Sequence, residues 1–330
     1  MMNRRNVLTF GVALLSAAAV RSVRASAQSA YPEHPIRLVV PRPAGGVVDV
    51  IARLWADRIK PHLGAIVIEN QGGGGGTIAA TAVAHAPADG YTLLAGTTSE
   101  LVINPVIMSQ ATYDPIKDLA PIAITAVSVS SLMVHASVPA RTLAELVAYA
   151  KANPGKLSFG SAGTGTPAHL CGELFKMLAG LPDIVHIPYK GAAPGLADFF
   201  AGHIPMMAAS ISPAVLEMHR AGKIRILVAG TNRRLKAAPD VPISTEAGFP
   251  DLITQQVNGI FAPAGTPRPI IEQIAAATRL IMAEAELQQK LIQAGFEPVT
   301  DSGSAEAAQY IHEELVRWTP LLKASGLRIN

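Results

Sequence analysis

The sequence predicts an α/β protein with two lobes, each an open, mostly parallel sheet flanked by helices. Short apolar strand-like runs alternate with helical patterns, and this alternation begins a second time near Leu132. The length of 330 residues, 49% apolar and 15% charged, is enough for two cores of ordinary size. Disordered, fibrous and coiled-coil classes are excluded, because no collagen or heptad period runs through the chain and charge is sparse.

The first series of elements is predicted as strand, helix, strand, helix, strand. In its first helix Val47, Ile51, Trp55 and Ile59 recur at helical spacing, and Gly64 ends the pattern. The expected strands are 36–40, 66–68 and 91–95, and the expected helices are 47–59 and 77–85. Such a βαβαβ unit begins an open parallel sheet.

The second series gives a second α/β domain. Its expected strands are 132–135, 157–159, 184–187 and 224–228, and its expected helices are 142–152, 170–178 and 196–200. From Pro267 on, the chain is mainly helical and has too few strands for a sheet of its own, so we expect it to pack on the first domain. This places lobe 1 at 28–128 and 258–330, and lobe 2 at 129–257.

Residues 1–27 are predicted to be an export signal peptide. Arg4 and Arg5 precede an apolar stretch, and Ala25-Ser26-Ala27 is a small-residue cleavage site. Both the twin-arginine (Tat) route and an ordinary Sec signal fit this pattern. Removing the four arginines of this segment from 27 basic residues leaves 23 against 24 acidic, so the mature chain has no basic surplus to attract nucleic acid. We expect a periplasmic protein.

The sequence offers little for thiolate, metal or cofactor chemistry. Cys171 is the only cysteine, which excludes an internal disulfide, and its apolar neighbours predict a small buried side chain. The histidines are scattered, with no H-E-x-x-H motif. We therefore expect no metal site and no cofactor.

Three glycine-rich loops between strands and helices are candidates for binding an anion. They are Pro43-Ala44-Gly45-Gly46, Gly72 to Gly76, and Gly160-Ser161-Ala162-Gly163-Thr164-Gly165-Thr166. In open α/β sheets ligands lie beyond the carboxyl ends of the strands, where backbone N–H groups and helix N-termini attract negative charge. Simple tight turns are the alternative, most of all for the second loop.

Two side chains beside these loops have both a structural and a ligand-binding interpretation. Asp49 lies in the first turn of the first helix, where it either complements the helix dipole or contacts a ligand ammonium or hydroxyl. His169 opens the helix after the third loop, where it either bonds locally or donates to a bound carboxylate.

Sharper enzyme motifs do not fit the loops. No lysine follows the glycines as a Walker loop requires, and neither register of Gly72 to Gly76 gives G-x-G-x-x-G. A nucleophile elbow, G-x-S-x-G, centred on Ser161 needs a glycine at position 159, but that residue is Phe159.

A set of short motifs runs in order along the whole mature chain. They are Tyr31-Pro32, Pro43 to Gly46 with Asp49 and Ala52-Arg53, Asp89 to Leu93, Asn104-Pro105, Asn153 to Leu157, Gly160 to Gly163 with His169-Leu170, His186 to Gly191, Pro239 to Pro242, and Ala262 to Pro267. Together these motifs resemble the substrate-binding proteins of tripartite tricarboxylate transporters, the Bug family. The chain departs from the family pattern at Arg42, where an aromatic residue is usual, at Val48 (Thr or Ser) and at Val257 (Trp or Tyr).

The resemblance implies a type II periplasmic binding protein fold whose two lobes close on a small organic carboxylate without catalysis. It implies a monomer that delivers this ligand to the integral-membrane permease subunits of the transporter. The expected ligand-binding residues lie in loops 43–49, 97–99, 161–166 and 189–192, with Arg42 and His169 beside them. They are Arg42, Ala44, Gly45, Gly46, Asp49, Thr97, Thr98, Ser161, Ala162, Gly163, Thr164, Thr166, His169 and Ala192.

Two other functions stay open from the sequence. One is an α/β hydrolase-like enzyme using Ser161 with a histidine such as His169, although no spacing for a complete catalytic set is recognisable. The other is a ligand sensor that informs a membrane signalling protein.

Overall fold

The computed structural model describes residues 31–108 and 112–324, and the predicted signal peptide lies outside these residues. Residues His34–Asn330 form one compact unit, and only 31–33 of the preceding unit are described. No helix within the described ranges is both long and apolar enough to cross a membrane.

The first three strands form the parallel sheet that the sequence predicts. β1 (Ile36–Val40) pairs in parallel with both β2 (Ile66–Asn70) and β3 (Thr92–Thr97). Leu38, Val39 and Val40 of β1 are fully buried, since helices cover both faces of the strand.

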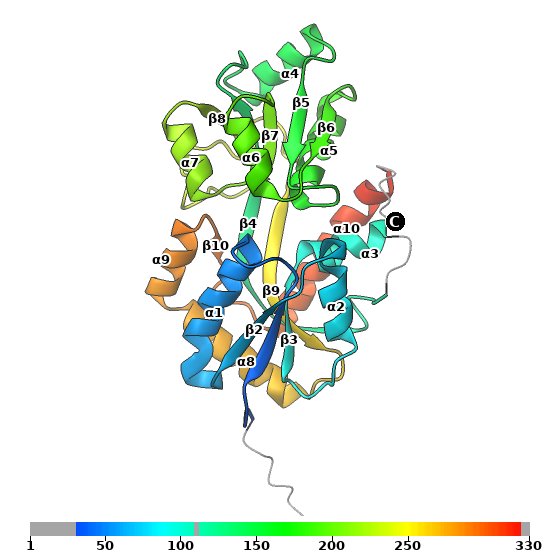
Figure 1. Cartoon of the computed structure of the whole chain (residues 1–330), viewed down its shortest axis with the longest axis vertical. Coiled ribbons are helices and arrows are strands. Elements are labelled where there is room, and N and C mark those ends of the chain that lie inside the picture. The colour runs from blue at the N-terminus through cyan, green and yellow to red at the C-terminus, as the bar shows by residue number, and fades with distance from the viewer. Residues whose placement is uncertain (1–30, 109–111, 325–330) are drawn as a thin grey trace, which may run out of the picture. The chain divides into compact units, whose positions relative to one another are not determined.

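Two long antiparallel strands connect the two groups of elements. β4 (Leu119–His135) pairs with β9 (Gln255–Pro263) over Leu119 to Val129, and then with other strands up to His135. Figure 1 shows β4 and β9 passing from the group around β1–β3 into the group around β5–β8. The sheet is therefore mixed, where the sequence predicted mostly parallel strands.

The second group is built on the carboxyl half of β4. That half pairs antiparallel with β7 (Met206–Ser210) on one side and with β8 (Ile224–Ala229) on the other. β5 (Ser158–Ser161) pairs in parallel with β7 and with β6 (Val185–Pro188). The order is β2-β1-β3-β9-β4-β7-β5-β6, and the short β10 (Glu297–Pro298) also pairs with β4.

The predicted helices all occur, and two more are present that the sequence did not predict. The helices are α1 (Val47–Leu63), α2 (Thr77–Ala84), α3 (Asn104–Ile107), α4 (Leu143–Ala152), α5 (Pro167–Ala179), α6 (Ala192–Phe200), α7 (Pro213–Arg220), α8 (Arg268–Met282), α9 (Ala285–Gln293) and α10 (Ser304–Ala324). The two that were not predicted are α3 and α7. A 3-10 turn, η1 (Gly74–Gly76), precedes α2, and a π-helical turn, η2 (Ser99–Ile103), follows β3.

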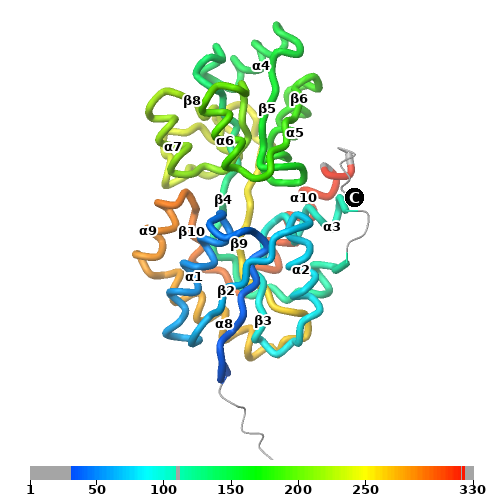
Figure 2. Tube along the Cα trace, viewed as in Figure 1, coloured from blue at the N-terminus to red at the C-terminus, as the bar shows by residue number. Residues whose placement is uncertain are grey.

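The C-terminal helices pack on the N-terminal elements. Figure 2 shows α8 and α9, in orange, beside α1, in blue, so segments distant in the sequence lie side by side. Both helices contact α1. Trp55 of α1 is buried and donates from Nε1 to Thr278 Oγ1 of α8 at 3.1 Å. The proposed lobe boundaries at 128/129 and 257/258 fall within β4 and β9 and stay a prediction.

Four strands differ from the sequence prediction. Only the last four residues of β4 were predicted, and β7, β9 and the two-residue β10 were not predicted. β7 reads Met-Met-Ala-Ala-Ser, whose intrinsic preference is helical, and β9 is interrupted by Asn258 and Gly259. Tertiary burial decides both segments, because β4 supplies the pairing partner for each.

Candidate functional site

The strand registers bring the carboxyl ends of both groups to one stretch of β4. β3 ends at Thr97, which pairs with Asn258, and Asn258 pairs with Ala126 of β4. From the other group, β7 ends at Ser210, which pairs with Ser130 of β4. Ala126 and Ser130 are four residues apart on β4, so the two strand ends are separated by about 14 Å along it, at about 3.4 Å per residue. The carboxyl ends of strands from both groups therefore face a common region, which is where open α/β sheets bind ligands.

Helix N-termini follow these strand ends, and they differ in how they are capped. Thr166 and Ser212 cap α5 and α7 with side-chain hydroxyls. Gly46 and Gly191 precede α1 and α6, and no side chain of the described residues caps either helix. The first N–H groups of α1 and α6 thus lack a side-chain acceptor, which suits them to an anion.

Asp49 organises the loop after β1. Its Oδ2 accepts the Gly45 N–H and Arg53 Nε, each at 2.8 Å, and its Oδ1 accepts Asn70 Nδ2 at 2.9 Å. Burial acts to raise the pKa of Asp49, but the hydrogen bonds from Arg53, Gly45 and Asn70 outweigh it and hold this pKa below its usual value. Asp49 is 2% exposed, so the structure favours the structural interpretation of this residue.

The same contacts bear on the predicted backbone donors of loop 43–49. The Gly45 N–H donates to Asp49, so it is not free for a ligand in this structure. Ala44 is exposed, and Gly46 has an extended backbone directly before α1.

The loop after β3 is held by Glu100, a residue that the sequence analysis did not single out. Glu100 Oε2 accepts the Thr97 N–H at 3.0 Å and the Thr97 hydroxyl at 2.6 Å. Thr98 Oγ1 accepts the Val257 N–H of β9 at 2.9 Å. Thr97 and Thr98 are buried and bonded within the fold, so their prediction as ligand contacts has no geometric support here.

Arg42 pairs with Glu100 across this region. Its Nη1 lies 2.7 Å from Glu100 Oε1 and also donates to the carbonyls of Pro41 and Gly75. The Arg42 side chain is 27% exposed, while the Glu100 side chain is fully buried. The pairing with a nearby acid is the structural alternative to a ligand contact at Arg42.

The loop after β5 forms a network of its own. Ser161 Oγ accepts the Gly163 N–H at 3.1 Å, and the Gly163 carbonyl accepts the Thr166 hydroxyl at 2.7 Å. The Ala162 carbonyl accepts the Gly191 N–H at 3.1 Å, which ties this loop to the start of α6. Thr164 is exposed at the tip, and Ala192 is exposed as the first residue of α6.

Two histidines lie against this loop. His169 Nδ1 accepts the Gly165 N–H at 3.2 Å, and His186 Nε2 lies 2.7 Å from Ser161 Oγ. The pKa of each imidazole is lowered to about 4: burial is the main cause for both, and the neighbouring His169 adds to the effect at His186. Both rings are therefore neutral at neutral pH.

The contact between Ser161 and His186 does not make a nucleophile. Ser161 is fully buried, and its hydroxyl is also bonded to Gly163. The histidine at Ser161 is His186, whereas the sequence suggested His169. Ser161 thus supports its loop rather than meeting a substrate carbonyl.

The departures Val48 and Val257 do not line an exposed surface. Val48 is 4% exposed and Val257 is fully buried. They pack in the interior of the fold, so neither of these two departures presents its side chain at an open surface.

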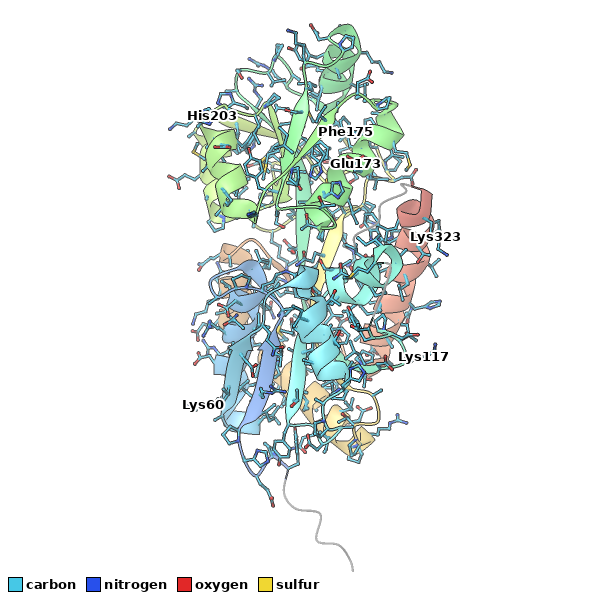
Figure 3. The ribbon with its side chains drawn as sticks, turned by 45° about the vertical axis from the view of Figure 1, so that its right-hand side comes forward. Lys60, Lys117, Glu173, Phe175, His203 and Lys323 are labelled. Atoms are coloured by element: carbon cyan, nitrogen blue, oxygen red, sulfur yellow. The ribbon has the colours of Figure 1, made fainter. Side chains whose placement is uncertain are left out.

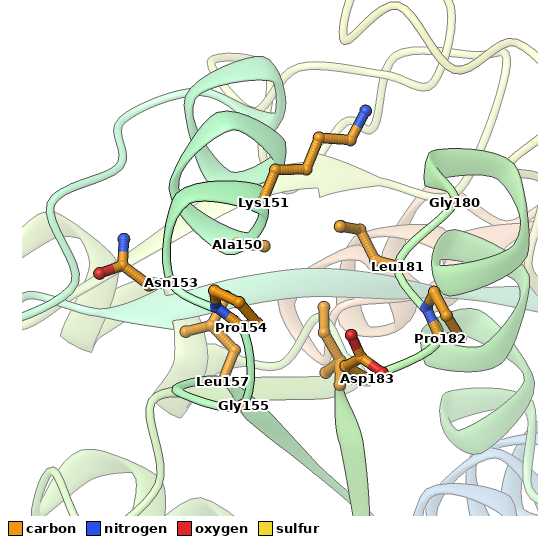
Figure 4. A pocket seen from close by; sticks show the side chains of 11 residues that line it. Ala150, Lys151, Asn153, Pro154, Gly155, Leu157, Gly180, Leu181, Pro182 and Asp183 are labelled. Atoms are coloured by element: carbon orange, nitrogen blue, oxygen red, sulfur yellow. The ribbon is translucent and has the colours of Figure 1, made fainter.

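A hollow of about 230 Å³ lies away from these loops, between the C-terminal ends of α4 and α5. Its lining includes Lys151, Asn153, Leu181 and Asp183, and Figure 4 shows the side chains around it. It lies at the amino ends of β5 and β6, opposite to the strand ends described above.

Sequence reasoning missed Glu100, His186 and Asn70 as site residues. Two of them had a signal: Glu100 is an acid among apolar and hydroxyl residues, and His186 is the second residue of a strand. Neither pattern says which loop the side chain contacts, because that depends on pairing across the sheet.

Comparison with known proteins decides the family. Residues 51–327 match the model of the tripartite tricarboxylate transporter family receptor, TctC. The chain belongs to this family. The resemblance to Bug proteins is thereby confirmed, and this family of solute-binding receptors supports a non-enzymatic role at family level.

Individual Bug and TctC proteins agree with this assignment. The chain is 32% identical to BugT of Bordetella pertussis over 91% of this chain and 92% of BugT. The structure of MatC from Rhodopseudomonas palustris with bound malate is 30% identical, with a TM-score of 0.78, over 88% of this chain and 100% of MatC. An R. palustris protein solved with adipate is 33% identical, with a TM-score of 0.81, over 90% of this chain and 99% of that protein. The two-lobed binding protein fold is therefore confirmed for this TctC chain.

Proposed function

We propose that this TctC chain is a periplasmic receptor that captures a small organic carboxylate between loop 43–49 on one side and loop 161–166 with the start of α6 on the other, and delivers it to a membrane permease. The observation that carries the proposal is the pair of glycine-led, uncapped N-termini of α1 and α6, one at each group of strand ends. A carboxylate between them accepts backbone N–H groups and meets the positive ends of two helix dipoles.

The charges around these loops favour an anion. The two buried carboxylates nearby, Asp49 and Glu100, are each paired with an arginine, Arg53 and Arg42 respectively. Their negative charge is compensated, so the helix ends are not opposed by free acids. The malate and adipate in the related structures support the same ligand class.

A thermal-shift screen of residues 28–330 tests the ligand class. The panel contains malate, adipate, an aliphatic monocarboxylate, an aromatic carboxylate, and neutral amides of the same carbon skeletons as matched controls. A ligand that binds only the folded state at 100 times its Kd adds about 2.7 kcal/mol of stability and raises Tm. We expect a shift with at least one carboxylate and none with its amide. Equal shifts with acids and amides, or none at all, would reject the proposal.

Closure of the two proposed lobes, 28–128 with 258–330 and 129–257, follows from a ligand that contacts both groups of loops. Such a ligand favours the closed state through its differential contacts. Small-angle scattering is expected to give a smaller radius of gyration with saturating ligand than without. Identical radii would contradict a hinge.

Export is tested separately. N-terminal sequencing of the exported protein is expected to begin near Gln28, and a mature chain retaining Arg4 would contradict cleavage. If the Tat route is used, replacing Arg4 and Arg5 with lysine blocks export, whereas unchanged export indicates Sec.

Delivery to the permease is tested by uptake. Cells that retain the permease but lack this receptor are expected to lose uptake of the carboxylate identified in the screen. Normal uptake with a lost transcriptional response would favour the sensor alternative.

A further inference from the structure

We propose that His169 and His186 form a stacked support that fixes loop 161–166 in its binding shape, so that both are positioning residues for the carboxylate. The inference rests on the proposed function of that loop and adds residues that act on the ligand only through it.

Three aromatic rings stack beneath the loop. The His169 and His186 ring centroids are 4.0 Å apart at 24°, and those of His186 and Phe159 are 4.8 Å apart at 27°. Phe159 and His169 are 1% and 3% exposed, whereas His186 of β6 is half-buried. Two of the three rings thus lie in the core, and the His186 ring stacks between them, so it cannot rotate without displacing Phe159 or His169.

Each histidine contacts the loop through one ring nitrogen, near opposite ends. His186 Nε2 reaches the Ser161 hydroxyl at the first residue of the loop, and Ser161 in turn accepts the Gly163 N–H. His169 Nδ1 accepts the Gly165 N–H near the last residue. The loop is therefore held at both ends by one rigid pair of rings.

The loop needs such support because of its glycines. Gly163 and Gly165 have φ of 127° and 77°. Because glycine has no Cβ, both residues can adopt many other backbone conformations unless contacts hold them in this one. Hydrogen bonds to fixed ring nitrogens select one geometry, and preorganised donors bind a ligand without an ordering cost.

The support works with neutral rings. A protonated His169 carries a hydrogen on Nδ1 and cannot accept the Gly165 N–H. The charged groups that act on the stack are Glu173 and Lys176 of α5, which pair with each other at 3.0 Å. Figure 3 labels Glu173 on this helix. The pair leaves no net charge at the rings.

Four single variants separate the hydrogen bonds from the stacking. His186→Phe keeps an aromatic ring but removes Nε2, whereas His186→Gln keeps a polar side-chain amide that can still contact the Ser161 hydroxyl. His169→Leu removes the Nδ1 acceptor, whereas His169→Asn places a carbonyl oxygen near the same position. Thermal melting identifies any variant that does not fold, and the Gln and Asn variants keep the comparison possible.

The first measurement uses the empty protein and needs no ligand. Amide hydrogen exchange of residues 162–166 is expected to be about tenfold faster in His186→Phe and His169→Leu, which is the change that one lost hydrogen bond produces. In His186→Gln and His169→Asn, which keep the hydrogen bond, the exchange rate is expected to stay within about threefold of wild type. Exchange in loop 43–46 is the internal control and stays unchanged. Unchanged exchange of 162–166 in the Phe and Leu variants overturns the proposal.

The second measurement uses adipate and malate as probes by calorimetry. Kd is expected to rise about tenfold in the Phe and Leu variants and to recover in the Gln and Asn variants. A weaker Kd with unchanged loop exchange means that the histidines contact the ligand directly, which overturns a positioning role. Faster exchange with no probe bound by wild type supports the positioning role and rejects the proposed function for these two probes.

Discussion

Arg42 and Glu100 form an ion pair in which the carboxylate is fully buried, with Nη1 2.7 Å from Oε1. The other carboxylate oxygen accepts both the N–H and the hydroxyl of Thr97. Arg42 follows β1 and Glu100 follows β3, so one pair connects two adjacent strand ends at the candidate site.

Replacing Arg42 alone is expected to destabilise the fold strongly. Arg42→Met leaves a buried, uncompensated carboxylate, which costs about 3 to 5 kcal/mol of unfolding free energy. The double variant Arg42→Met with Glu100→Gln removes that charge and is expected to recover most of the loss. Urea denaturation at pH 7 measures both. Lys117→Met, which breaks an exposed pair with Asp114, is the control and changes stability by less than about 1 kcal/mol. Equal effects at Arg42 and Lys117 would contradict a structural role for the pair.

Arg42 is also predicted to recognise a second carboxylate on the ligand. Nη1 contacts Glu100 and two carbonyls, and the Arg42 side chain is partly exposed. Among the described residues Nε and Nη2 have no acceptor, so both can donate to one carboxylate in a bidentate contact. Adipate is then expected to bind more tightly than hexanoate, and the Arg42→Met, Glu100→Gln double variant is expected to lose this difference. Calorimetry with both acids measures it. A preference that survives in the double variant would remove Arg42 from recognition.

Gly46→Val is expected to weaken carboxylate binding tenfold or more while the protein stays folded. Gly46 has φ of −76° and ψ of 168°, which valine tolerates, and an added Cβ lies 3.3 Å from the Pro43 carbonyl. The added side chain obstructs approach to the start of α1, and each charge-assisted hydrogen bond lost costs about 1.5 to 3 kcal/mol. Ala65→Val, an exposed substitution just after α1, is the matched control. An unchanged Kd in Gly46→Val would exclude this helix end from the site.

Stability is expected to fall as pH decreases from about 6.5 to about 4. Burial lowers the pKa of His169 from 6.5 to about 4, so the unfolded chain binds a proton more readily than the folded protein in this interval. The contribution is present above pH 6.5, is on the order of 3 kcal/mol for His169, and is lost as pH falls through about 4. The pKa of His186 is lowered too, mainly by burial, while the nearby Glu173 acts to raise it and Lys176 to lower it. Urea midpoints measured across this range are expected to slope less in His169→Asn than in wild type. The exposed His62→Asn is the control, and equal slopes in all three proteins would contradict the assignment.

Much of the fold could be predicted from local patterns. β1, α1 with its end at Gly64, and α4 with its Thr142 cap occur where the sequence places them. Each has a strong local signal: a continuous apolar run, helical periodicity or a capping residue. Most of β4, and all of β7 and β9, could not be predicted, because their conformation depends on partners distant in the sequence.

The candidate site shows the same division between local and distant information. The glycines before α1 and α6 mark helix ends that can take an anion, and they are visible in the sequence. The side-chain partners of Arg42 and Ser161 are not visible in the sequence. Glu100, the partner of Arg42, follows a different strand, β3, and His186, the partner of Ser161, lies in β6, which pairs with β5. Residue type identifies a candidate, and only strand order reveals whether its hydrogen bonds are already used.

The pairing of β4 with β9 also determines when the sheet can be completed during synthesis of the chain. More than a hundred residues separate Leu119 to Val129 from their partners in Gln255 to Pro263. A chain that emerges from its N-terminus therefore presents β4 with an open edge until most of its length has appeared, and such edges recruit other strands. Chains that stop before residue 255 lack the strand that covers this edge, so premature termination yields an aggregation-prone fragment rather than a shortened receptor.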